Sequence, residues 1–191
     1  MNAFCLLLVS AFAIAQEAKP VVLDAAALAK LQTVAFQAAR EGDVKTLTEY
    51  FKLGRPVNDV NARGDTLLTV AAYSGSAAAV AEILKQPKVE IDVKNRMGLS
   101  ALTAAAFKGE VEIAKVLVKA GADVNLANGS KQTALMFASL AGKVKMVEYL
   151  LSAGANPAAA DDKGNTALKL AETQGADDVV RVLEKALAAK K

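Results

Sequence analysis

The residue types that most often carry catalysis are scarce in this chain. The sequence has no histidine and a single cysteine, Cys5, so the usual general base, thiolate nucleophile and zinc ligands have almost no candidates. Neighbouring acids such as Asp161 and Asp162, or Glu110 and Glu112, could in principle share acid–base work. Acids at loops and helix starts more commonly cap helices or face solvent. We therefore expect no enzymatic activity, no metal site and no cofactor.

The charge of the chain also argues against nucleic acid as a partner. Lys and Arg together number 23 and Asp and Glu number 20, for a net charge of +3 at neutral pH. The basic residues are spread along the chain, whereas a nucleic-acid-binding surface concentrates them on one face beside stacking aromatics. We expect no nucleic-acid binding.

The strongest pattern in the sequence is a repeat. Five glycines recur at intervals of 33, 34, 33 and 33 residues, and a fixed period of this size indicates stacked copies of one supersecondary unit. Such stacks build a long open surface, so their usual role is to bind another macromolecule. The glycines are Gly42, Gly75, Gly109, Gly142 and Gly175.

Each glycine occupies the same place in a longer pattern. A hydroxyl residue stands nine positions before it, an alanine stands four positions before it, and an apolar stripe with helical spacing follows, as in residues 111–118 and 144–151. The hydroxyl can cap a first helix, and the glycine allows the chain to reverse into a second helix. The pattern predicts helix, turn, helix and loop. The hydroxyl residues are Thr66, Ser100, Thr133 and Thr166, with Thr33 in the weaker first copy.

These runs resemble the ankyrin-repeat family, whose pattern is D-x-x-G-x-T-P-L-H-x-A-A-x-x-G followed by an apolar helix and G-A-D-x-N. The matching runs span residues 61–75, 95–109, 128–142 and 161–175. The resemblance implies an all-α fold, an ankyrin-repeat solenoid of about five stacked helix–turn–helix units with short finger loops. It places the repeat domain at 33–191, with repeats at about 33–60, 61–94, 95–127, 128–160 and 161–191.

The chain departs from the family pattern in ways that affect stability more than fold. No copy keeps the proline or the histidine of Thr-Pro-Leu-His, so the preset first helical turn is lost. An insertion near Pro87 lengthens one interval, and Lys131 replaces a loop glycine in the fourth copy.

The N-terminal segment indicates secretion. Residues 4–14 form an uncharged apolar run, followed by Ala13-Ile14-Ala15 and Gln16, which together fit a signal peptide cleaved after Ala15. The run is too short to span a bilayer, and its other interpretation is a short buried or membrane-tethered helix. Cleavage would remove Cys5, and a mature chain without disulfides fits the bacterial periplasm better than a eukaryotic secreted domain.

Residues 16–32 are expected to form a polar lead and a capping helix before the repeats. Asp24 offers an N-cap. We expect Leu28, Leu31, Val34 and Ala38 to share one face of this helix.

The resemblance places the partner-binding surface on the concave side, at the exposed ends of the first helices and at the loop tips. There Tyr73, Phe107 and Leu140 are expected to form an apolar ridge, because large apolar groups in a row on a surface indicate an interaction site. The alternative is that they pack against adjacent repeats. The remaining aromatics are expected in the core: Phe36, Tyr50, Phe51, Phe137 and Tyr149. The other expected binding residues are Arg40, Arg63, Asp65, Arg96, Met97, Leu99, Lys108, Gln132 and Thr173.

These observations together predict a monomeric periplasmic module that binds a protein and is not an integral membrane protein. Resemblance to periplasmic ankyrin proteins implies an inhibitor or immunity role against a wall-cutting peptidase. Two alternatives remain open, namely a scaffold or chaperone that supports a periplasmic enzyme, for example in oxidative-stress defence, and a secreted factor directed at a host protein.

Overall fold

The structure, a computed structural model, describes residues 24–189. The predicted signal peptide at 1–15 and its alternative lie outside this range. The chain divides into two units, 1–31 and 32–191, which are described separately. All regular elements of the described residues are helices: α2 (Ala25–Glu41), α3 (Val44–Lys52), α4 (Leu67–Tyr73), α5 (Ala77–Leu84), α6 (Ala101–Lys108), α7 (Val111–Lys119), α8 (Ala134–Leu140), α9 (Val144–Ser152), α10 (Ala167–Thr173) and α11 (Asp177–Ala188).

Helix α2 begins in the first unit, where Asp24 Oδ1 accepts a hydrogen bond from the Ala27 N–H at 2.7 Å, as an N-cap should. The helix then continues without a break to Glu41. Thr33 therefore lies inside a helix, and the prediction that it caps the first repeat is wrong because Asp24 starts the helix earlier. Val34, expected to share a face with Ala38, is 50% exposed.

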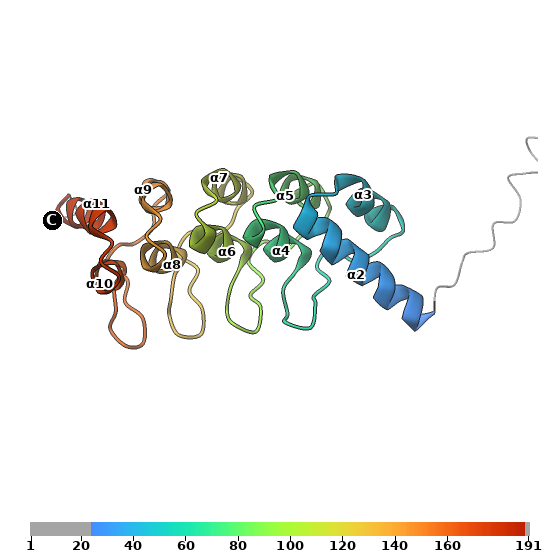
Figure 1. Cartoon of the computed structure of the whole chain (residues 1–191), viewed down its shortest axis with the longest axis horizontal. Helices are drawn as coiled ribbons and strands as arrows, with labels where there is room; N and C mark the ends of the chain where they lie inside the picture. Colours follow the sequence, from blue (N-terminus) through green and yellow to red (C-terminus); the bar gives the residue numbers. More distant parts are fainter. Residues whose placement is uncertain (1–23, 190–191) are drawn as a thin grey trace, which may run out of the picture. The chain divides into compact units, whose positions relative to one another are not determined.

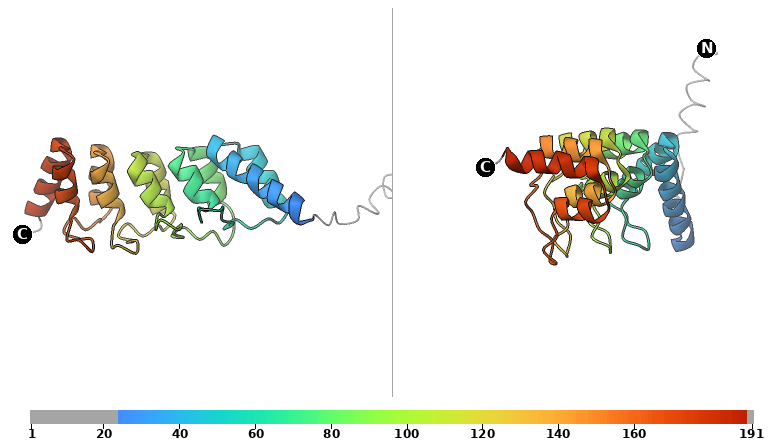
Figure 2. Two further views of the ribbon diagram at one scale, coloured as in Figure 1. Left: turned by 60° about the horizontal axis from the view of Figure 1, so that its bottom comes forward. Right: turned by 60° about the vertical axis from the view of Figure 1, so that its left-hand side comes forward.

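In the second unit the later helices form two layers (Figures 1 and 2). One layer contains α4, α6, α8 and α10 in succession, and the other contains α5, α7, α9 and α11, with α3 beside α5. Each first-layer helix also packs on the second-layer helix that follows it in sequence. The loops that precede the first-layer helices extend from the side opposite the second layer (Figure 1). We call these loops the fingers: residues 60–66, 95–100, 127–133 and 160–166. The fold confirms the predicted all-α repeat solenoid.

The predicted hydroxyl residues start the first-layer helices. The Oγ atoms of Thr66 and Ser100 accept the backbone N–H three residues later at 3.1 and 3.3 Å, and Thr133 and Thr166 do the same at 3.4 and 3.3 Å. Each cap contributes about 1 kcal/mol to stability.

The predicted turn glycines end these helices. Gly42, Gly75, Gly109, Gly142 and Gly175 all have φ between 64° and 83°, a left-handed conformation that costs other residues energy. In the third copy, for example, the Gly109 N–H donates to the Ala105 carbonyl at 2.8 Å.

The core lies between the layers and between successive repeats. Ala71, Ala105, Ala138 and Ala171 are all fully buried, and their small size allows neighbouring first-layer helices to approach closely. The second-layer helices contribute larger side chains to the core, namely Ile83, Leu117, Leu150 and Leu183.

The predicted aromatic core is only partly correct. Phe36 and Tyr50 are buried, but Phe51, Phe137 and Tyr149 are half-buried. Within residues 24–189, no helix has both the length and the apolar character required to cross a bilayer.

Candidate functional site

The fingers are held by a repeated side-chain turn. In the second finger, Asn95 Oδ1 accepts hydrogen bonds from the backbone N–H groups of Met97 and Leu99, both at 2.9 Å. Asn61, Asn128 and Asp161 repeat this arrangement in their own fingers, with distances between 2.8 and 3.1 Å. An Asx side chain that binds its own loop fixes the loop conformation. The finger tips are therefore well-defined platforms for the side chains that they carry.

Neighbouring fingers are also joined to one another. The Arg96 N–H donates to the Arg63 carbonyl at 3.1 Å, and the Asp162 N–H donates to the Ser130 carbonyl at 3.1 Å. A Cβ atom built on Gly98 would lie only 2.6 Å from Asn128 Cβ, which shows how closely the second and third fingers pack.

The carboxylate of Asp65 links the first two fingers by hydrogen bonds. Its side chain is buried, and it accepts hydrogen bonds from Asn95 Nδ2 at 2.6 Å, Asn61 Nδ2 at 3.0 Å and Arg63 Nε at 3.0 Å. Burial on its own would raise the pKa of this carboxyl. The hydrogen bonds from the two asparagines, together with Arg63, outweigh that effect and lower the pKa below 3.8. Asp65 therefore stays ionised at neutral pH.

Between the fingers and the first-layer helices runs a groove of about 790 Å³. Its lining comes from α2, α4, α6 and α8 in succession and from the first three fingers, all within the second unit. It contains nine of the twelve residues expected to bind a partner: Arg40, Arg63, Asp65, Tyr73, Met97, Leu99, Phe107, Lys108 and Gln132.

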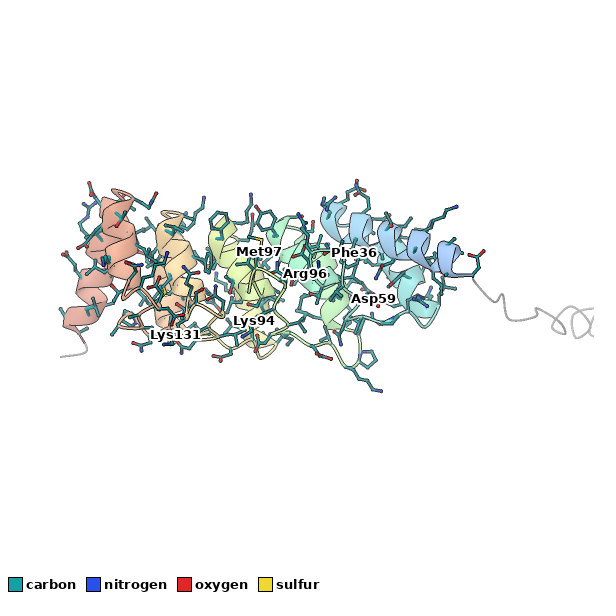
Figure 3. All side chains as sticks on the ribbon, turned by 90° about the horizontal axis from the view of Figure 1, so that it is seen from below. Phe36, Asp59, Lys94, Arg96, Met97 and Lys131 are labelled. Atoms are coloured by element: carbon teal, nitrogen blue, oxygen red, sulfur yellow. The ribbon has the colours of Figure 1, made fainter. Side chains whose placement is uncertain are left out.

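The groove presents large apolar side chains. Tyr73 is 45% exposed, Phe107 is 38% exposed, and Met97 is 72% exposed. Tyr73 and Phe107 are thus partly covered by protein, in line with the packing alternative, and both also line the groove. Figure 3, seen from the finger side, shows Met97 beside Arg96 on the second finger. Exposed apolar groups gathered in one concave surface are typical of an interaction site.

Three of the expected residues do not line the groove. Leu140 is half-buried, Arg96 is exposed on its finger, and Thr173 donates its Oγ1–H to the Lys169 carbonyl at 2.8 Å. The apolar ridge is thus made by Tyr73 and Phe107, without Leu140.

Six residues that line the groove were not among the expected binding residues: Thr69, Val70, Ser74, Asn95, Ala104 and Phe137. Three of them share one position of the repeat. Val70, Ala104 and Phe137 each stand five residues before a turn glycine, and all three contribute to the lining. Their common offset was a signal that could have identified them. Phe137, predicted to be core, instead supplies the apolar wall of the groove in the fourth copy.

The described residues contain no cluster of three His, Cys, Asp or Glu side chains able to hold a metal ion. What the groove offers is shape, apolar surface and charge, which together support noncovalent recognition.

The comparison with known families agrees with this architecture. The family described as Ankyrin repeats (3 copies) matches residues 35–128 and 120–190. The chain therefore belongs to the ankyrin-repeat family, whose repeats are protein-interaction modules and are typically not enzymes. No curated protein sequence gives a significant match to the chain.

Proposed function

We propose that this chain is a periplasmic inhibitor that binds a wall-cutting peptidase through the groove and blocks access to its active site. The observation that carries the proposal is the groove itself, where Tyr73, Met97 and Phe107 are exposed side by side with cationic residues. Aromatic and arginine side chains of this kind dominate the binding energy of protein interfaces. A concave surface of this length is able to bury about 800 Å² per partner, the usual size for a specific complex.

Inhibition by occlusion requires no chemistry from the inhibitor. A rigid surface that covers a substrate cleft stops turnover by exclusion, and the hydrogen-bonded fingers provide such rigidity at little entropic cost on binding. This mode of action is consistent with a chain that lacks histidine and contains one cysteine.

The periplasmic location is supported by residues 4–15, with their apolar run and Ala13-Ile14-Ala15. We expect the secreted protein to begin at Gln16, and the intact mass of the protein purified from the periplasm measures this directly. A protein that retains residues 1–15 would contradict cleavage and favour the tethered helix.

The test of function is capture from the producer's periplasmic extract with three immobilised baits. The first is the parent chain, and the second carries Tyr73→Ala, Met97→Ala and Phe107→Ala. The third is a matched control that removes exposed apolar side chains outside the groove: Val34→Ala, Leu53→Ala and Val116→Ala. Circular dichroism and thermal unfolding are used to check that all three baits are folded.

We expect the parent and the control to capture the same hydrolase, the groove variant to lose it, and the parent to abolish peptidoglycan cleavage at a one-to-one ratio. A captured enzyme whose turnover or stability increases would instead indicate the supporting role. Equal capture by all three baits would show that the groove is not the binding surface.

A further inference from the structure

We propose that the groove receives an extended acidic segment of its partner, with carboxylates facing Arg40 and Lys108 and an apolar side chain lying against Tyr73 and Phe107. This inference rests on the proposed function, because it names the chemistry of the partner at the same groove.

The first argument for an acidic partner segment comes from the charged side chains of the groove. Four side chains that are charged at neutral pH line it, namely Arg40, Arg63, Asp65 and Lys108. The Asp65 carboxylate already accepts hydrogen bonds from Arg63 and from two asparagines. Among residues 24–189, neither Arg40 nor Lys108 has a carboxylate oxygen within 4.0 Å.

The surroundings of these two cations leave them available to an anion. Arg40 Nη1 donates to the neutral Gln37 Oε1 at 3.2 Å, and Lys108 Nζ lies 5.2 Å from the centroid of the Tyr73 ring. Both side chains are exposed. The groove thus has two positive charges without a charged partner, and complementary charge from a bound molecule would satisfy them.

The apolar lining carries the second step. Tyr73 and Phe107 stand at the same position of consecutive repeats, two residues before the turn glycines, and Met97 on the second finger lines the same groove. An apolar side chain inserted here would be removed from water on several sides. The required partner sequence therefore combines acidic residues with a large apolar one.

The course of the groove favours an extended segment. Its lining residues come from α2, α4, α6 and α8, from Arg40 on α2 to Phe137 on α8. An extended peptide can contact each repeat in turn, as in other cases of groove recognition. A polyanion such as single-stranded nucleic acid fits less well, because it carries a charge on every nucleotide, whereas the groove offers two unpaired cations beside an apolar surface.

The experiment uses a phage-displayed library of random dodecapeptides and the purified full chain as bait. We expect the enriched sequences to carry Asp or Glu close to Phe, Trp, Leu or Met. A fluorescent synthetic copy of the most enriched peptide then measures affinity. No enrichment, or enrichment of neutral or basic sequences, would overturn the proposal.

Two charge variants test the residues. Arg40→Gln with Lys108→Gln removes two groove cations, whereas Lys119→Gln with Lys145→Gln removes two exposed cations from the second-layer helices α7 and α9. We expect the groove pair to weaken peptide binding by about tenfold or more and to reduce its salt dependence, with little change from the control pair. Equal effects of the two pairs would contradict the proposal.

A fluorescent single-stranded oligonucleotide of random sequence is titrated in parallel. If the oligonucleotide binds more tightly than the peptide, and the Arg40→Gln and Lys108→Gln variant loses that binding, the cations are assigned to nucleic acid and the inference is overturned.

The two proposals can also fail separately. If the captured hydrolase is inhibited equally by the parent and by the Arg40→Gln and Lys108→Gln variant, the acidic segment is wrong and the inhibitor role survives. If acidic peptides bind but no hydrolase is inhibited, the inhibitor role is wrong and the acidic character of the bound segment survives.

Discussion

Lys108 Nζ lies 5.2 Å from the centroid of the Tyr73 ring, and this contact joins the exposed ends of α6 and α4 in adjacent repeats. A cation over an aromatic face at an exposed site contributes about 0.5–1 kcal/mol. The contact also restrains a ring that lines the groove. A partner would therefore meet a partly ordered aromatic surface, which reduces the entropy lost on binding.

The packing between fingers predicts a large difference between two Gly→Ala substitutions. Gly98 and Gly164 occupy the same finger position, with φ of 78° and 74°, so alanine is strained at both. At Gly98 the new Cβ would also lie 2.6 Å from Asn128 Cβ, whereas at Gly164 it meets nothing within 4 Å. We expect Gly164→Ala to cost about 1 kcal/mol of stability and Gly98→Ala about 2–4 kcal/mol, measured by urea unfolding. Equal losses would show that the fingers are not closely packed.

Lys131 predicts a stabilising substitution. It occupies the same finger position as Gly98 and has φ of 60°, which is unfavourable for a residue with a side chain. Lys131→Gly would relieve that strain, worth about 1 kcal/mol. It would also remove the exposed ion pair with Asp162 at 3.0 Å, whose contribution is about 0–1 kcal/mol. We expect a small net gain in thermal stability at high salt, where the ion pair is screened. A decrease at high salt would contradict the strain argument.

The lowered pKa of Asp65 predicts that the stability of the fold decreases at acid pH. Because its pKa is lowered in the folded state, the stabilisation from this carboxylate is present above its ordinary pKa of 3.8 and is lost as the pH falls through the folded value. Asp65→Asn would place an amide against donors from Asn61 and Asn95, at a cost of about 1–3 kcal/mol at neutral pH. We expect the difference in unfolding free energy between parent and variant to shrink below the ordinary pKa. A difference that is constant with pH would exclude the ionised carboxylate as the cause.

The raised pKa of Tyr50 predicts that the stability of the fold decreases at alkaline pH. Burial, followed by the hydrogen bond that its hydroxyl donates to Asp59 Oδ2 at 2.5 Å, raises its pKa to about 12, although Arg55 partly opposes this shift. The neutral phenol is therefore favoured in the fold. The stabilisation that the neutral phenol gives to the fold is complete below pH 10 and is lost as the pH rises through about 12. Tyr50→Phe should remove this part of the alkaline destabilisation, which thermal unfolding across the range would detect. An unchanged alkaline profile would contradict it.

The sequence predicted those parts of the fold that depend on local chemistry. Thr66 and its equivalents cap helices because a hydroxyl side chain bonds its own backbone, and Gly109 and its equivalents end them because they tolerate a positive φ. The prediction that Thr33 caps a helix was wrong because Asp24 caps α2, which begins at Ala25 and already contains Thr33; the repeat pattern carried no information about this longer first helix.

The site depended on side-chain directions that spacing alone left ambiguous. Tyr73 and Phe107, two residues before their turn glycines, line the groove, but Leu140 at the same position is half-buried outside the lining. Phe137, one turn earlier on α8, lines the groove instead. Which of two neighbouring apolar residues faces a concave surface is decided by packing with the adjacent repeats, and this is not a property of one repeat's sequence.

The most direct test of the central claim is hydrogen–deuterium exchange of the chain with and without its captured partner. If the groove is the binding surface, the partner should slow exchange in the second finger, residues 95–99, and at the ends of α4 and α6 around Tyr73 and Phe107. The second-layer helices α5, α7 and α9 should exchange as in the unbound chain. Protection confined to those second-layer helices, with the fingers unchanged, would contradict the account.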